Sequence, residues 1–160
     1  MTAQALTAAQ AALAAEHAAV YGYGVVGART SGGSRSEATS AYHAHRARRD
    51  ALTRAVRDLG GEPVVADAAY ALPFAVHDGA AALRLAAVLE DGVAGACADL
   101  VRATEGTDRR DAALALREAA VRAARWRGSG VAFPGLAERA GRAGTASPSP
   151  LEAAGAAGTH

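Results

Sequence analysis

The residues best suited to chemistry lie on one segment in the first third of the chain. Tyr42, His45 and Arg49 are three and four residues apart, so a helix would place them on one face. Leu52 and Val56 continue this stripe with aliphatic side chains, as residues facing a helical core do. A buried polar side chain without a partner costs about 1–3 kcal/mol, so the polar half of the stripe needs partners on neighbouring helices.

Single carboxylates interrupt the apolar stripes of three other segments, at Glu16, Glu90 and Glu118. The predicted inward stripe of the last segment reads Asp111, Leu114, Glu118, Val121 and Arg125. In di-iron carboxylate bundles, two helices supply one glutamate each and the other two supply a Glu-x-x-His pair each. The same arrangement here would make Glu16, His45, Glu90 and Glu118 the candidate metal ligands. Iron or manganese is the metal that such a site would hold.

This ligand set is incomplete, because Tyr42 stands where the second helix would carry its glutamate and Val121 where the fourth would carry its histidine. Arg49 and Arg125 fall on or near the inward stripes and could supply the positive charge instead of a metal. Three interpretations stay open: a metal-free polar network that includes Tyr42, Arg49 and Arg125, a single metal or altered redox site, and a small-ligand pocket. The sequence favours the first interpretation, the metal-free polar network, in which the protein binds no cofactor.

Capping residues and glycines divide the chain into four helical segments. Thr7 with Gln10, and Ser34 with Glu37, have the spacing of a capping box. Asp78 is placed to cap the third segment and Thr107 the fourth. The glycine pair at 60–61 closes the second, and residues 27–35 form a flexible connection. The predicted helices cover residues 8–26, 34–59, 79–103 and 108–127.

The long connection over residues 60–77 sets the predicted topology. Its apolar side chains, including Tyr70 and Phe74, give it enough surface to lie across the bundle. One long crossover between two helix pairs is typical of ferritin-like bundles. We predict an all-α fold, a ferritin-like four-helix bundle over residues 6–138 with a long crossover between helices 2 and 3. Residues 131–136 should pack on the bundle end, and residues 139–160 form a flexible Gly/Ala/Ser/Pro-rich tail.

Charge and composition narrow the class of protein further. The formal net charge is +1 and the isoelectric point is near 8.0, so neither a nucleic acid nor a membrane surface is expected as a partner. Cys97 is the single cysteine, which excludes an internal disulfide and suits a buried small side chain. No stretch is long and apolar enough to cross a bilayer. We expect a cytoplasmic protein that forms a homodimer through exposed apolar helix faces.

Four short motifs, taken in order and spacing, resemble one known family. They are EHAAVYGYG at residues 16–24, HRARRD at 45–50, LED at 89–91 and FPGL at 133–136. The chain is similar, over about residues 6–138, to an uncharacterised ferritin-like family of actinobacteria, a domain of unknown function. The resemblance implies a ferritin-like bundle, often dimeric, with no established activity.

Two functions follow as expectations, and the sequence leaves open whether the protein is an enzyme. The first is a non-catalytic binding or scaffold protein with a degenerate metal site. The alternative is a metal-dependent oxidoreductase or metal-binding protein with an altered carboxylate and histidine ligand set.

Overall fold

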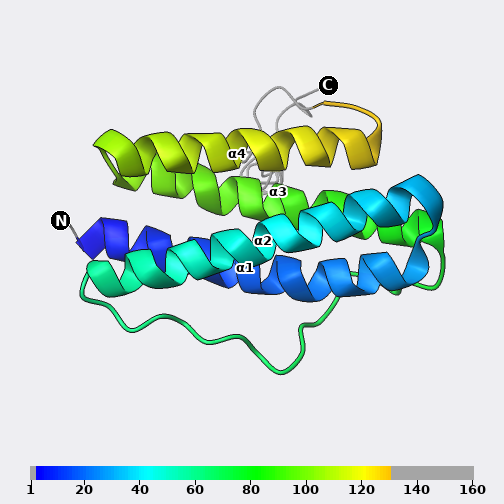
Figure 1. Ribbon diagram of the computed structural model, residues 1–160, viewed down its shortest axis with the longest axis horizontal. Coiled ribbons are helices and arrows are strands. Elements are labelled where there is room, and N and C mark those ends of the chain that lie inside the picture. The colour runs from blue at the N-terminus through cyan, green and yellow to red at the C-terminus, as the bar shows by residue number, and fades with distance from the viewer. Residues whose placement is uncertain (1–2, 131–160) are drawn as a thin grey trace, which may run out of the picture.

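The computed structural model describes residues 3–130, which form four α-helices and no strand. These are α1 (Ala3–Arg29), α2 (Gly32–Asp58), α3 (Gly79–Ala103) and α4 (Gly106–Arg127). Figure 1 shows α1 and α2 in one layer, and α3 and α4 in the other. The predicted all-α four-helix bundle is confirmed. Within the described part of the chain, no helix is long and apolar enough to cross a membrane.

The connection between α2 and α3 runs along the outside of α1, in the same direction as that helix (Figure 1). Near the start of α1, the Gln10 side chain accepts a 2.8 Å hydrogen bond from the backbone N–H of Val64. Further along, the Tyr21 ring lies 5.5 Å from that of Tyr70. The connection therefore returns the chain to the end of the bundle where α1 ends, so α2 and α3 run parallel. The predicted long crossover is confirmed.

The third helix begins as predicted and the first does not. Asp78 accepts a 2.7 Å hydrogen bond from the N–H of Ala81 and so caps α3. Thr7 lies inside α1, where its hydroxyl donates to the carbonyl of Ala3, and the Gln10 side chain is used by the crossover. The predicted capping box at the start of α1 is therefore wrong, because both of its side chains have other partners.

The connection between α1 and α2 is also much shorter than predicted. Ser31, not Ser34, precedes α2, and no side-chain hydrogen bond caps the helix. Gly32 has a φ of +54°, which only glycine adopts without strain, so the chain turns sharply. Gly106, with a φ of +57°, begins α4 in the same way, ahead of the predicted cap Thr107. Glycines with positive φ therefore form these two turns, where we predicted a flexible connection and caps at Ser34 and Thr107.

Alanine fills most of the core, so the helices pack closely. The buried apolar residues form three clusters along the bundle, around Tyr23 and Leu85, around Val93 and Cys97, and around Leu13 and Val56. Cys97 is 3% exposed, as predicted for a buried small side chain. The polar side chains described below lie among these clusters and connect all four helices.

The predicted core face of α4 is wrong by about one residue. The side chains that α4 buries are all alanines, at positions 112, 115, 119 and 123. The predicted stripe is exposed along its whole length, at Asp111, Leu114, Glu118, Val121 and Arg125. The predicted packing of residues 131–136 and the predicted tail at 139–160 lie outside the described residues.

Candidate functional site: a buried charge network

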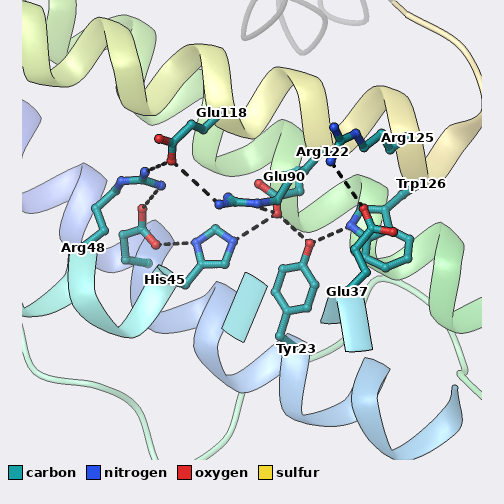
Figure 2. Close-up of polar contacts among 10 residues, drawn as sticks. Tyr23, Glu37, His45, Arg48, Glu90, Glu118, Arg122, Arg125 and Trp126 are labelled. Carbon is teal, nitrogen blue, oxygen red and sulfur yellow. Dashed lines mark hydrogen bonds and ion pairs between the residues drawn. The ribbon is translucent and has the colours of Figure 1, made fainter. Parts of the chain in front are cut away.

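His45 lies at the centre of the bundle between two carboxylates (Figure 2). Its Nδ1 atom is 2.6 Å from Oε2 of Glu16 and its Nε2 atom is 3.0 Å from Oε1 of Glu90. All three side chains are at most 1% exposed. A neutral imidazole has only one N–H, so two short contacts with carboxylate oxygens require the protonated ring.

The environment of His45 keeps that proton bound. Burial by itself lowers the pKa of His45, because a charged ring loses its hydration. The hydrogen bonds and negative charges of Glu16 and Glu90 act in the opposite direction and together outweigh burial. The pKa of His45 is therefore raised above its ordinary value of 6.5.

Two aromatic side chains continue the hydrogen bonds toward the end of the bundle where α1 ends. The Tyr23 hydroxyl donates a 2.6 Å bond to Oε1 of Glu90 and accepts a 2.8 Å bond from Nε1–H of Trp126. The Tyr23 ring also stacks on His45, with 5.2 Å between ring centroids. Burial, followed by the charge of Glu90, raises the pKa of Tyr23, so the phenol remains a hydrogen-bond donor.

Two arginines, Arg48 of α2 and Arg122 of α4, complete the network (Figure 2). Arg48 places Nη2 2.5 Å from Oε2 of Glu118 and Nη1 3.6 Å from Oε1 of Glu16. Arg122 places Nη1 3.7 Å from Oε1 of Glu90 and Nη2 3.7 Å from Oε2 of Glu118. Burial lowers the pKa of Arg48, but Glu16 and then Glu118 outweigh it, so the pKa is raised. A guanidinium is not deprotonated in proteins, so both arginines bring a positive charge into the bundle.

The charges of this network balance. The negative charges come from Glu16, Glu90 and Glu118, and the positive ones from Arg48, Arg122 and protonated His45. Four buried atoms have no hydrogen-bond partner among the described residues: Oε1 of Glu16, Oε2 of Glu90 and Nη1 of each arginine. The guanidiniums thus compensate Glu16 and Glu90 through charge at 3.6–3.7 Å, without a hydrogen bond.

The structure brings together three of the four candidate metal ligands. Glu16, His45 and Glu90 meet directly, at similar depth on α1, α2 and α3. Glu118 is 55% exposed and joins them only through Arg48 and Arg122. Its partial exposure follows from the rotation of α4 described above.

The structure contradicts the predicted network roles of Arg49, Arg125 and Tyr42. Arg49 turns away from the centre and forms 2.9 and 2.7 Å hydrogen bonds with its neighbour Asp50. Arg125 is 68% exposed, with Glu37 3.9 Å away. Tyr42 packs against the apolar cluster around Tyr23 and Leu85 and makes no polar contact with the network. Arg48 and Arg122 provide the positive charge that we had assigned to Arg49 and Arg125.

Sequence reasoning missed both inward arginines, although their spacing carries a signal. Arg48 follows His45 by three residues and Arg122 follows Glu118 by four, so each lies one helical turn from a predicted site residue. Searching for cations one turn from each inward polar residue would have found both. No comparable spacing identifies Trp126, whose indole reaches the network only through Tyr23.

The arrangement joins helices α1, α2 and α3 through the two ring nitrogens of His45. A histidine that ligates a metal offers a ring-nitrogen lone pair to it, whereas both nitrogens of His45 face carboxylate oxygens. Within residues 3–130, no group of three or more His, Cys, Asp or Glu side chains is arranged to hold a metal ion. Burial raises the pKa of Cys97 to about 12, so the nearby thiol is not an activated nucleophile.

Comparison with known proteins places the chain in a family. A conserved hypothetical protein, rv2844, from Mycobacterium tuberculosis has a crystal structure similar to this one, with a TM-score of 0.75 and 39% sequence identity. The match covers 79% of this chain and 98% of that one. No curated protein matches the chain. Residues 8–138 match a family described as a domain of unknown function, and the chain therefore belongs to this family, DUF4439.

Proposed function

We propose that this protein is a non-catalytic, ferritin-like binding or scaffold protein whose central site is a metal-free charge network. The balance of charges around His45 carries the proposal. Three carboxylates from three helices would repel one another in a low-dielectric interior unless cations separated them. Arg48, Arg122 and protonated His45 supply that charge from the chain itself.

The positions of the ring nitrogens support the same interpretation. A metal bound by His45 would require the ring to give up its contact with Glu16 or with Glu90. It would also place a cation near two guanidiniums, whose repulsion would oppose binding. The residues present therefore fit a network of ion pairs better than a di-iron centre.

One observation favours the alternative, a metal-dependent oxidoreductase or metal-binding protein. Oε1 of Glu16 and Oε2 of Glu90 are buried carboxylate oxygens without a hydrogen-bond partner among the described residues. Carboxylate oxygens of this kind are ligands that iron and manganese accept. A bound cation would satisfy both atoms if His45 were neutral and one arginine moved.

Metal analysis together with unfolding tests the proposal. The protein, purified without chelator, should contain no stoichiometric iron or manganese by elemental analysis. Its urea midpoint should not change when EDTA is added, because the network needs no metal. About two irons per chain, together with oxidase activity that is lost in Glu90→Ala, would establish the alternative and refute the proposal.

We also propose that the protein is a homodimer that pairs through α4. Leu114 and Val121 are 51% and 44% exposed and lie seven residues apart, so they share one face of α4. In an antiparallel pair of α4 helices, Leu114 of one copy would meet Val121 of the other. Because Leu114 and Val121 lie outside the core, replacing both with glutamate should leave the monomer folded. Sedimentation equilibrium should then show a dimer for the native protein and a monomer for the double variant, and a native monomer would refute the pairing.

A further inference from the structure

A groove of about 570 Å³ lies between α2 and α4 and reaches the network at Arg48. Its walls are mainly small and apolar, with Ala44, Ala47, Ala51 and Ala55 from α2. Cys97 and Leu100 of α3, with two alanines of α1, form the floor. Small side chains on both walls leave the space between the two helices unfilled. This volume is within the usual range for small-molecule sites, about 300–1,000 Å³.

The shape of the groove indicates what could occupy it. Its lining on α2 extends from Ala44 to Leu59, which corresponds to a length of about 22 Å at 1.5 Å per helical residue. A long groove with apolar walls suits a single extended aliphatic chain.

The two ends of the groove differ in charge. Arg48 lines the inner end, but Glu118 and Glu16 already compensate it. Asp108 and Asp111 line the other end, at the start of α4, and neither carboxylate has a hydrogen bond or ion pair within residues 3–130. Arg109, the adjacent cation, donates instead to the backbone carbonyls of α3 and its C-cap. The outer end of the groove is therefore complementary to a cation.

We infer that this groove binds an amphiphile with one unbranched alkyl chain and a cationic head group. The chain lies along the alanines between α2 and α4, and the head group lies beside Asp108 and Asp111. Burial of the methylene groups supplies most of the binding free energy, and the carboxylates select the sign of the head group. The groove borders the network only through Arg48 at its inner end, whereas the head group lies at the outer end, so the inference does not rest on whether that network holds a metal.

Dodecylamine, which is protonated at pH 7, is a suitable probe at concentrations below its micellar range. Isothermal titration calorimetry with the full chain should show saturable binding of one molecule per chain. Dodecanoate has the same chain with the opposite charge, and butylamine has the same head group with a short chain, so both should bind more weakly. Reaction of Cys97 with a thiol reagent should slow when dodecylamine is bound, because this single cysteine lies on the floor of the groove.

Two pairs of variants locate the site. Ala51→Phe fills the groove and should abolish saturable binding, whereas Ala113→Phe, at an exposed alanine of α4 outside the groove, should not. Asp111→Asn should weaken binding about 2- to 5-fold, as expected for one exposed ion pair. Asp67→Asn in the crossover makes the same charge change away from the groove and should have no effect.

Three results would overturn the inference. The first is absence of saturable dodecylamine binding to a protein whose circular dichroism shows it to be folded. The second is equal affinity for dodecanoate, which would mean that the chain binds without selection of charge. The third is protection of Cys97 that rises with protein concentration in the absence of ligand, which would assign the groove to a second copy of the chain.

Discussion

Arg48 and Glu118 form a 2.5 Å ion pair that joins α2 to α4. The same guanidinium lies 3.6 Å from Glu16, which is 1% exposed. One arginine therefore joins the two helices at the inner end of the groove, and it also compensates a buried carboxylate. The stability of the bundle should depend on it.

Arg48→Leu should lower the free energy of unfolding by about 1–3 kcal/mol, because buried Glu16 loses one of its two cations and keeps His45. The solvent exposure of Glu118 keeps the loss below that of a fully buried pair. Arg49→Leu removes an equal charge from the neighbouring position and should change stability by less than about 0.5 kcal/mol. Urea unfolding of both variants measures the difference, and equal losses would mean that Arg48 does not have this role.

The raised pKa of His45 predicts a specific dependence of stability on pH. A group whose pKa is higher in the folded than in the unfolded state stabilises the fold fully below its unfolded pKa, near 6.5. That contribution is lost as the pH rises through the folded pKa. The free energy of unfolding of the native protein, relative to His45→Gln, should therefore decrease as the pH is raised above 6.5.

Denaturant titrations at several pH values between 5 and 10 test this dependence. His43→Gln provides the control, because His43 lies two residues away on the exposed side of α2. Its stability should follow that of the native protein at every pH. A constant difference between the native protein and His45→Gln across this range would show that His45 does not change protonation on unfolding.

Tyr23→Phe removes the hydroxyl that joins Glu90 to Trp126. The loss should be about 1–3 kcal/mol, because a buried carboxylate oxygen and an indole N–H both lose a partner. Trp126 is the single tryptophan, so its fluorescence spectrum should also shift in the folded variant. Tyr21→Phe changes an exposed hydroxyl on the same helix and should alter neither stability nor fluorescence.

Two glycines of α1 should respond in opposite ways to alanine. A Cβ atom at Gly22 would overlap the side chain of Leu89 on α3, whereas one at Gly24 would meet no atom within 4 Å. Both substitutions gain the same helix propensity, so their difference reports packing alone. Gly22→Ala should be less stable than Gly24→Ala by about 1–3 kcal/mol in thermal or urea unfolding. Equal stabilities would show that α1 and α3 have room to separate.

The amino-acid sequence predicted the topology well because its signals there were strong. Asp78 and the long segment that follows α2 define the start of α3 and the crossover. Glu16, His45 and Glu90 were found because each is a polar residue on an otherwise apolar stripe. These features depend on residues whose character differs sharply from that of their neighbours.

The rotation of α4 could not be predicted in the same way. Its inner face consists of alanines, and alanines also occur on its outer face, while the larger Leu114 and Val121 are exposed. Hydrophobic periodicity weights large side chains most heavily, so it placed the wrong face inward. On α2, Arg48 and Arg49 follow His45 by three and four residues, so spacing alone did not distinguish them. Only packing of α4 against α3, and of α2 against α1, distinguishes these faces.

The long crossover also has a consequence for the order of folding events. Helices α1 and α2, and likewise α3 and α4, are joined by short turns, so each hairpin closes with little loop entropy. The bonds from His45 to Glu90, from Arg48 to Glu118 and from Tyr23 to Glu90 all cross between the hairpins. Desolvation of these charges must accompany docking of the two hairpins. Variants of these residues should therefore show when docking occurs. Slower refolding would mean that the hairpins dock before the folding transition state, and faster unfolding would mean that they dock after it.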